Sequence, residues 1–259
     1  MAHLGSDVAA ACPDSRRCPE GAITLRAVRT NLVGPTATRL AGASVTLHPL
    51  RRRDLAELAR VPDDPAWELL LRRPAGGAAT AEGWLTEALR GVRRGTERCW
   101  TIRDSADGRL LGSTRFLNVD VANRRLEIGA TWLLPEARGS VANAESKLLL
   151  LDHAFDDLGM LRVHIQADVR NDRSRRAIEA LGATFEGVLR RHIVLADGTS
   201  RDTAVYSILA DEWPALRMAL VARLESRLPV WRGQPSSLLP QLPAPPVDWD
   251  APPIRVAIA

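Results

Sequence analysis

The sequence predicts an α/β domain in which helices cover both faces of a mixed, mostly antiparallel sheet. Two observations carry this prediction. Between residues 99 and 134, three extended segments follow one another with only tight turns between them, which indicates an antiparallel meander. Between residues 161 and 195, a helical segment separates two extended ones. Such a unit beside antiparallel hairpins indicates a mixed sheet.

The first half of the domain alternates between helical and extended patterns. Apolar residues recur at helical intervals over residues 51–61, 63–73 and 80–94. Thr80 is expected to be the N-cap of the last of these helices. Strands are expected over residues 44–50, 99–105, 109–120 and 125–134, with turns at residues 106–108 and 122–123.

The second half opens with a long helix over residues 141–159. Four apolar residues recur on one face of this helix, at Leu148, Leu151, Phe155 and Leu158, and Gly159 ends it. The later elements are a strand, a helix, a hairpin of two strands that turns at residues 197–198, and a closing helix. They are expected over residues 161–169, 171–182, 183–195, 200–209 and 211–228.

The pattern of elements divides the chain into three parts. Residues 44–228 form the domain with its closing helix. Residues 1–43 lack sustained periodicity and are expected to be a flexible extension, a short capping segment, or the product of a start codon placed too early. Residues 229–259 form a proline-rich tail, which is incompatible with a helix or an interior strand.

The charge of the chain does not favour a nucleic-acid-binding protein. The formal net charge is +4 and the pI is near 9.6, but no basic run is longer than residues 51–53. Among 35 basic residues, Lys147 is the only lysine. A bias toward arginine does not explain why one lysine remains, and the two cations differ wherever geometry matters. Lys147 is therefore a candidate functional residue, although chance retention is an alternative.

Cysteine usage and hydropathy indicate a cytoplasmic protein without a metal. Three cysteines are too few for a disulfide framework, and Cys12 and Cys18 lack the spacing of a zinc site. No apolar run reaches 18 residues, so no membrane span is expected. The N-terminus also lacks the pattern of a signal peptide.

The segment from Arg138 to Lys147 is the first candidate site. Its small residues allow close approach of a ligand, and a helix that begins there directs free N–H groups outward, which suits a pyrophosphate. Arg138 can add a charge-assisted contact. The alternative is an ordinary helix cap. Asn171 and Ser174 at the start of the next helix have the same two interpretations.

Taken together, several blocks of the sequence resemble the GNAT superfamily of N-acetyltransferases, and more closely its RimJ/RimL-like branch. The blocks occur in the family's order between residues 44 and 213. They read EIGATWL, RGSVANAESKLLLLDHAF, LRVHIQADVRNDRSRRAIEALGA, EGVLRRHIVLADG and RDTAVYSILADEWPAL. The resemblance implies the GNAT fold, with acetyl-CoA as cosubstrate and a primary amine as acceptor.

The resemblance also implies where the coenzyme binds. The strands over residues 125–134 and 161–169 should part at one end and receive the pantetheine arm, which pairs with the free backbone of the first strand. Val141 stands where the family's loop has its first glycine, and Asn143 where it has its second. Val141 must therefore reach a tolerable φ, and the loop amides are expected to cradle the phosphates slightly differently. The implied coenzyme-binding residues are Thr131, Trp132, Leu133, Arg138, Gly139, Ser140, Val141, Ala142, Asn143, Lys147 and Asn171.

Two residues are candidates for proton transfer. Glu127 lies on the first of these strands, where family members hold a general base, and it would act through water. Its alternative role is an ion pair with Arg124 or Arg125. Ile178 stands where the superfamily often has a tyrosine that protonates the departing thiolate, so Ser174 is the remaining candidate, or water serves instead.

The acceptor is the most open part of the prediction. It is either a protein N-terminal α-amine or a small-molecule amine. His192 could face it, although a lone strand histidine is more often structural. The alternative function is a noncatalytic module that binds coenzyme A or a partner, which the departures at Val141 and Ile178 motivate. No membrane or nucleic-acid partner is expected, and the chain is predicted to be a monomer or a homodimer.

Overall fold

The computed structural model describes residues 38–64, 69–72, 78–195 and 197–227. The predicted tail over residues 229–259, and all but residues 38–43 of the predicted N-terminal extension, lie outside the described residues. In the described part, no helix is long and apolar enough to cross a membrane, and no group of three or more His, Cys, Asp or Glu side chains could hold a metal ion.

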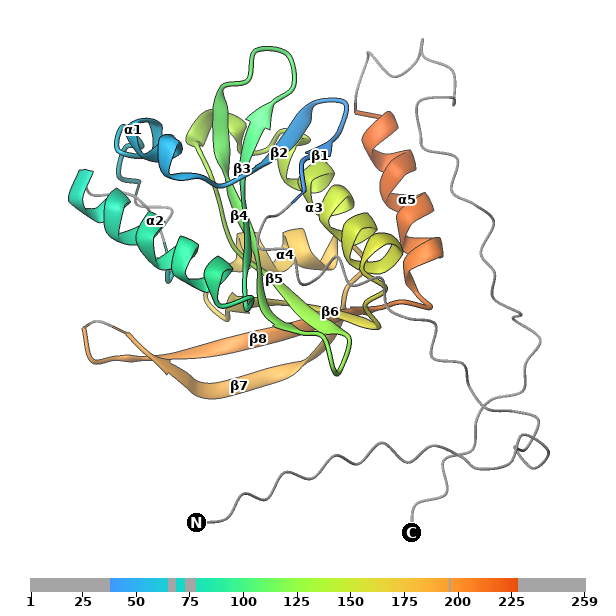
Figure 1. Ribbon diagram of the computed structural model, residues 1–259. Helices are drawn as coiled ribbons and strands as arrows, with labels where there is room; N and C mark the ends of the chain where they lie inside the picture. Colours follow the sequence, from blue (N-terminus) through green and yellow to red (C-terminus); the bar gives the residue numbers. More distant parts are fainter. Residues whose placement is uncertain (1–37, 65–68, 73–77, 196, 228–259) are drawn as a thin grey trace, which may run out of the picture.

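One eight-stranded sheet forms the centre of the domain, in the order β1-β2-β3-β4-β5-β6-β8-β7 (Figure 1). Every neighbouring pair is antiparallel except β5 and β6, which are parallel. The predicted mixed, mostly antiparallel sheet is therefore confirmed. The strands are β1 Leu40–Ala41, β2 Val45–Pro49, β3 Arg98–Asp104, β4 Leu110–Asp120, β5 Arg125–Leu133, β6 Arg162–Asp168, β7 Thr184–Val194 and β8 Ser200–Leu209.

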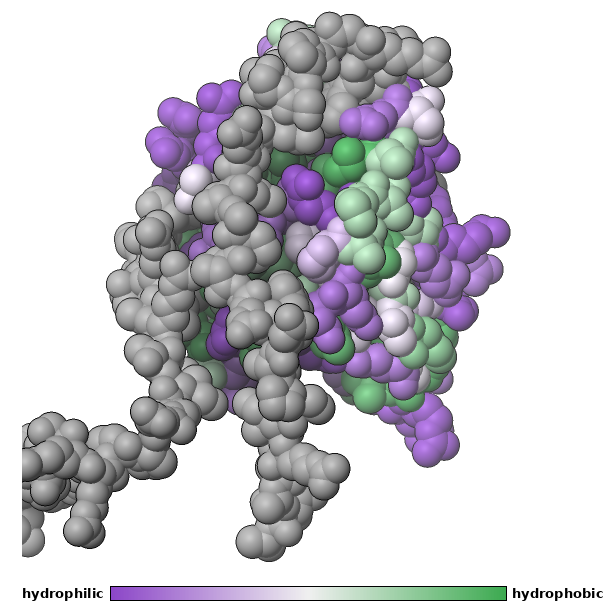
Figure 2. Space-filling model, turned by 90° about the vertical axis from the view of Figure 1, so that its right-hand side faces the viewer, coloured by the Kyte–Doolittle hydropathy of each residue, from purple (hydrophilic) through white to green (hydrophobic). Residues whose placement is uncertain are grey.

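Helices cover both faces of this sheet (Figure 1). One face carries α1 (Leu55–Leu58) and α2 (Ala78–Arg93), and the other carries α3 (Ala142–Asp152), α4 (Asp172–Glu179) and α5 (Trp213–Glu225). The side that bears α5 mixes hydrophilic and weakly hydrophobic residues (Figure 2), among them the exposed Met218. The closing helix predicted from the sequence is confirmed as α5.

Two apolar cores result, one on each face of the sheet. The larger joins β2–β6 and β8 to the inner sides of α3, α4 and α5, and it includes Leu148, Leu151, Phe155 and Leu158, the four residues of the predicted helical stripe. The smaller lies beneath α1 and α2 and contains Trp84 and Trp132. Each sheet face is therefore buried by its own helices, which fixes the strands between them.

Three expectations for individual elements are wrong, and a fourth is tested only in part. Of the helix expected over residues 63–73, residues 63–64 and 69–72 are not helical, and residues 65–68 and 73 lie outside the described residues. Helix α2 begins at Ala78, so Thr80 lies inside it and is not its N-cap. The helix expected over residues 51–61 is shorter, since a 3₁₀ turn over Arg52–Asp54 precedes α1. The long helix is α-helical only to Asp152 and continues as a π-helical turn, His153–Asp157.

The beginning of the domain also differs from the expectation. Leu40 and Ala41, assigned to the N-terminal extension, pair with Leu47 and Thr46 as strand β1. The Glu145 carboxylate on α3 accepts the backbone N–H groups of Ala43 and Ser44. Residues 38–43 therefore belong to the folded domain.

Candidate active site

The two parallel strands part after three residue pairs. Strands β5 and β6 are paired from Arg125 and Arg162 to Glu127 and His164, and their pairing stops there. Beyond that point β6 stays with β8 to Asp168, while β5 stays with β4 to Leu133. The splay that the family resemblance implies is present, and the β5 edge that faces β6 has no strand partner over residues 128–133.

A β-bulge in β5 lies at the opening. Between the pairs Arg115–Gly129 and Ser113–Trp132, strand β5 has one residue more than β4. Ala130, one of the two residues between these pairs on β5, has φ +47°, a left-handed conformation that is unfavourable for a residue with a Cβ. Bulges bend a strand and redirect its side chains. Strained backbone of this kind is common at functional sites.

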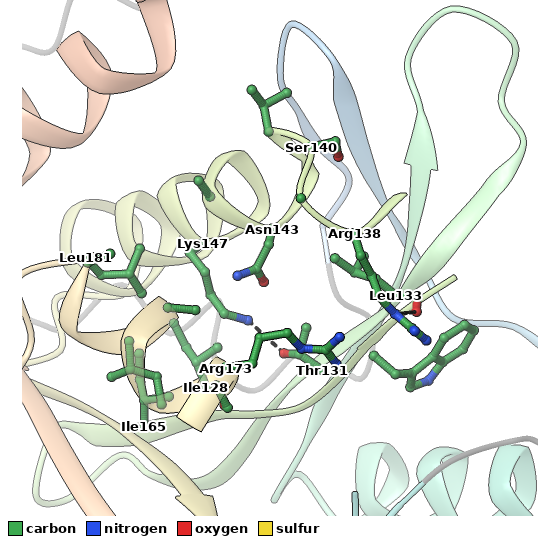
Figure 3. Close-up of a pocket in the computed structure, with 18 of the residues that line it drawn as sticks. Ile128, Thr131, Leu133, Arg138, Ser140, Asn143, Lys147, Ile165, Arg173 and Leu181 are labelled. Carbon is green, nitrogen blue, oxygen red and sulfur yellow. Dashed lines mark hydrogen bonds between the residues drawn. The ribbon is translucent and has the colours of Figure 1, made fainter. Parts of the chain in front are cut away.

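A cavity of about 440 Å³ occupies the gap between the parted strands. Its walls come from β5, β6, the start of α3, α4 and the end of α5 (Figure 3). Among the described lining residues none is Asp or Glu, whereas five are cationic: Arg138, Lys147, Arg173, Arg223 and Arg227. The volume is in the range of about 300–1,000 Å³ that is usual for ligand sites. The lining favours an anionic ligand.

The start of α3 forms one wall of the cavity. The first intrahelical bond runs from the Glu145 amide to the Val141 carbonyl, so the preceding amides of Asn143 and Ala144, which line the cavity, have no partner within the helix. The Ala142 amide instead donates to Ser140 Oγ at 3.1 Å, and Ala142 is buried behind the lining. The predicted loop residues Gly139, Ser140, Val141 and Asn143 line the cavity, and Ala142 does not.

Val141 reaches a tolerable φ, as the family resemblance requires. Val141 is the N-cap of α3 with φ −70° and ψ −14°, an ordinary helical conformation. The left-handed residue of the loop is Gly139, with φ +75°. Glycine is thus present where the backbone requires it, and the departure at Val141 does not distort the loop.

Arg138 lies at the β5 end of the loop rather than at the helix start. Its Nη2 is 2.7 Å from the Asp64 carboxylate, and its Nε donates to the Leu133 carbonyl at 3.2 Å. The guanidinium therefore bridges β5 to the loop before α2. It lines the cavity, which leaves its expected contact with a phosphate as a prediction.

Lys147 is buried in the floor of the cavity. Its side chain points from α3 toward β5, where Nζ donates to Thr131 Oγ1 at 2.7 Å (Figure 3). Thr131 Oγ1 also shares a 2.8 Å hydrogen bond with the buried Thr114 hydroxyl. The described hydrogen-bond partner of Nζ is therefore a hydroxyl group, and a contact of Lys147 with the coenzyme remains a prediction. Burial lowers the pKa of Lys147 to about 7.

Asn171 and Ser174 lie together at the start of α4. Asn171 is the N-cap, and its Oδ1 accepts the Ser174 amide at 3.0 Å, so the capping interpretation is correct. Both residues also line the cavity, as does Ile178 at the expected tyrosine position. Tyr206 lies outside the lining, where its hydroxyl donates to Glu179 at 2.9 Å.

Glu127 lies behind the cavity wall, at the last pair before the strands part. Its Oε2 accepts from Asn118 Nδ2 at 2.9 Å and is 3.4 Å from His164 Nε2. A Cβ at the lining residue Gly129 would be 2.8 Å from Glu127 Oε1, so the carboxylate packs directly against the cavity wall.

The alternative ion pairs of Glu127 are wrong, because the neighbouring arginines are bonded elsewhere. Arg124 donates to the Gly159 carbonyl and Arg125 donates to Asp120. His192 lies apart, exposed on β7 in a second, more open hollow with Arg170 and Arg190.

The sequence analysis missed three cationic residues of the site. Arg173 reaches from the start of α4 toward the β5 side of the cavity (Figure 3), Arg223 lies near the end of α5, and Arg227 lies in the turn after it. In the sequence, the four-residue spacing of Arg223 and Arg227 in the helix expected over residues 211–228 is the one signal that could have paired them. Their position against α4 depends on the tertiary fold.

The family model described as "Acetyltransferase (GNAT) domain" matches residues 44–184. This is more than half of the chain. The matched range runs from the residue before β2 to the first residue of β7 and includes the parted strands, the α3 loop and α4.

Individual proteins are similar as well. A Bacillus subtilis protein named "Putative ribosomal N-acetyltransferase YdaF" is 36% identical over 107 residues, which cover 41% of this chain and 57% of that protein. The chain thus aligns with little more than half the length of this curated relative.

Solved structures of similar fold cover more of the domain. A GCN5-related N-acetyltransferase from Brucella melitensis has 32% identity and a TM-score of 0.66, covering 72% of this chain and 85% of its own. RimJ from Mycobacterium smegmatis, solved in complex with CoA-disulfide, has 25% identity and a TM-score of 0.61, covering 74% and 95%.

Proposed function

The chain belongs to the GNAT acetyltransferase family, and from this premise we propose that it transfers the acetyl group of acetyl-CoA to a primary amine. The amine attacks the thioester directly. One observation carries the proposal: β5 and β6 part to form a cavity with cationic side chains and no carboxylate among its described lining residues. Acetyl-CoA carries an activated acyl group and several negatively charged phosphates. The cationic lining of the cavity suits the phosphates, and the free edge of β5 suits the thioester end.

The residues present fit this cosubstrate. The helix-start amides of Asn143 and Ala144 can donate to a pyrophosphate, and the cations of the lining can neutralise it. The unpaired edge of β5 can accept a pantetheine arm as an added strand. We propose that Thr131, Trp132 and Leu133 bind the pantetheine arm through their backbone groups. The side chain of Trp132 is not available for this contact, because its ring packs against Trp84 on the opposite face of the sheet.

Two parts of the chain then promote the reaction. Backbone N–H groups of β5 near Thr131 donate hydrogen bonds to the thioester carbonyl and stabilise its developing negative charge. The Glu127 carboxylate, held by Asn118, accepts a proton from the attacking amine through water. A protein α-amine has a pKa of about 8 and needs less assistance than a lysine side chain near 10.4.

We propose a protein N-terminus or a small-molecule amine as the acceptor, and the cytoplasm as the place of reaction. The name of the Bacillus subtilis relative points to ribosomal acceptors and supports N-terminal peptides of ribosomal proteins as the first substrates to test. The loop before α2 approaches the site through Asp64 and Leu70 and is the part of the described chain most suited to select among amines.

The test is amine-dependent release of free thiol from acetyl-CoA, measured with the full chain and a panel of peptides and small amines. Turnover with at least one amine class is expected. Glu127→Gln should lower kcat by about 10²-fold or more and leave acetyl-CoA affinity within about threefold, because the carboxylate lies outside the cavity lining.

Glu82→Gln is the matched control, since Glu82 is an exposed carboxylate on α2. Its kcat should equal that of the unmodified chain. Coenzyme binding without thiol release across the whole panel would contradict the proposed reaction and favour a noncatalytic module. Unchanged turnover in Glu127→Gln would remove Glu127 from the role of base.

A further inference from the structure

Lys147 combines three properties that a structural lysine does not need. It is the only lysine of the chain, it is 5% exposed, and it lines the cavity in which we propose that acetyl-CoA binds. Buried charges in proteins are normally paired with an opposite charge. The described lining of this cavity contains no Asp or Glu, and the hydrogen bond of Nζ goes to the Thr131 hydroxyl, which carries no charge.

The position of Nζ is defined by its contact with β5. Nζ is 2.7 Å from Thr131 Oγ1, and Thr131 follows the bulge residue Ala130, where β5 no longer has β6 beside it. Because an ammonium carries three protons, one can bind Thr131 while another is directed into the cavity. The proposed reaction places the thioester against the backbone of this same part of β5.

We propose that Lys147 donates the proton that the departing sulfur takes up, an inference that rests on the proposed acetyl transfer. The amine nitrogen forms a bond to the acetyl carbon, the bond between that carbon and sulfur breaks, and a proton passes from Nζ to sulfur. The two protons that the attacking ammonium gives up leave through Glu127 and water. Solvent then returns one proton to Lys147, so one proton is released per turnover.

Acidity favours this direction of transfer. A thiol has a pKa of about 8.5 and an ordinary lysine about 10.4, so an ordinary lysine is too weak an acid to protonate a thiolate efficiently. Burial lowers the pKa of Lys147 to about 7, below that of the thiol. The other charged residues of the described lining are arginines, which stay protonated throughout this range and do not titrate with it.

The hydroxyl groups near the site are less suited than Lys147 to protonate the departing sulfur. Tyr206 lies outside the cavity and its hydroxyl is bonded to Glu179 and Arg175. Ser174 lines the cavity, but a serine hydroxyl holds its proton far more tightly than an ammonium does. Among the described residues that line the cavity, Lys147 is therefore the strongest acid able to lose its proton near neutral pH.

The single lysine allows a direct measurement that does not depend on turnover. The full chain is labelled with lysine carrying ¹³Cε, and the one side-chain signal is followed by NMR between pH 5 and 11. A midpoint near 7, and a shift of the signal when coenzyme A is added, are expected. A midpoint above 9, or a signal that ignores coenzyme A, would overturn the inference, whether or not an acceptor amine is known.

Kinetics of two variants provide the second test. Because the donor must hold its proton, kcat of the unmodified chain should fall as the pH rises above about 7. Lys147→Met should lower kcat by about 10²-fold or more and remove this fall, with coenzyme affinity within about threefold. Lys147→Arg keeps a cation, but a guanidinium cannot readily lose its proton. This variant should therefore be as slow as Lys147→Met. Ser146→Ala, the adjacent buried residue, controls for disturbance of α3 and should leave kcat unchanged.

The possible outcomes separate this inference from the proposed function. If the unmodified chain releases thiol and Lys147→Met is equally fast, the proton-donor role is wrong and acetyl transfer stands. If Lys147→Arg restores kcat, or only coenzyme affinity falls, Lys147 is a contact for the coenzyme. Accumulation of acetylated Lys147 would show that Nζ acts as a nucleophile and would also overturn the role. If no amine is acetylated, the proposed function fails. The NMR titration still measures the pKa of Lys147 and its response to coenzyme A, because it does not depend on turnover.

Discussion

Two cations are buried on opposite faces of the sheet, and their surroundings differ completely. Arg115 on β4 is fully buried under α2, with Nη1 2.9 Å from Glu87 and 3.0 Å from Glu97 and its guanidinium over the Trp84 ring. Lys147 on α3 is nearly as buried, but its Nζ donates to the Thr131 hydroxyl, which in turn is hydrogen-bonded to the Thr114 hydroxyl. The first has the pairing of a structural charge. Burial of the Lys147 ammonium costs desolvation free energy, and no carboxylate of the described cavity lining offsets this cost.

This difference indicates which of the two faces performs chemistry. A buried charge with carboxylate partners holds elements together, as Arg115 holds β4 to α2. A buried amine at a cavity, with its pKa lowered toward neutrality, is better suited to proton transfer than to stability. Removing each cation in turn and changing the pH tests whether the two faces differ in this way.

Removing Arg115 should have the largest effect on stability. Arg115→Met leaves the buried Glu97 with the partly exposed Arg72 as its one cationic partner among the described residues, and the free energy of unfolding should fall by about 3–5 kcal/mol. The measurement is guanidinium unfolding at pH 7. Arg109→Met removes an exposed ion pair with Asp104 and should lose less than about 1 kcal/mol. A loss for Arg115→Met no greater than that of this control would contradict the structural role.

Unlike Arg115, which stabilises the fold through its ion pairs, the buried ammonium of Lys147 lowers the stability of the folded state. This effect depends on pH. The pKa of Lys147 is lowered by burial to about 7, so below pH 7 both folded and unfolded chains hold the proton and the folded state bears the full penalty. Between pH 7 and about 10.4 only the unfolded chain holds it, so stability rises with pH. The unfolding free energy of the unmodified chain should gain about 2 kcal/mol relative to Lys147→Met from pH 7 to 9.

Denaturant unfolding of both proteins at the two pH values measures this gain. Other groups titrate equally in both proteins, so the difference between them isolates Lys147. A constant difference would mean that the folded state leaves the pKa of the lysine near its ordinary value.

Removing an exposed cation of the cavity should have the smallest effect. Arg173→Ala should weaken coenzyme A binding about threefold to tenfold, less so at high salt, because Arg173 is solvent-exposed. Arg176→Ala removes an exposed arginine of the same helix that does not line the cavity, and titration calorimetry should show no change for it. Equal weakening in both variants would mean that Arg173 acts only through the overall positive charge of the protein and makes no specific contact with the coenzyme.

The strands and long helices could be predicted from local patterns, and the family resemblance supplied what those patterns lack. Alternation predicted β3, β4 and β5, and the apolar stripe of α3 matches the larger core. The parting of β5 from β6 has no local signal, because it depends on β6 turning to pair with β8. Only the resemblance to several ordered blocks implied it.

The details of the site were less predictable, since they depend on tertiary contacts. The left-handed conformation of Ala130 arises from register with β4, and alanine gives no sign of it. Arg223 meets the cavity only because α5 packs against α4. Lys147 was found as a candidate through its rarity, yet its hydroxyl partner and its burial emerge only in three dimensions.

The account depends most on a coenzyme entering the gap between β5 and β6. Titration calorimetry with coenzyme A on the unmodified chain and on Ala177→Trp tests this directly, because Ala177 lines the cavity and an indole there would fill it. One-site binding is expected for the unmodified chain. The variant should bind at least about 100-fold more weakly and should keep a cooperative unfolding transition. No binding to the unmodified chain, or equal binding to a folded Ala177→Trp, would contradict the account.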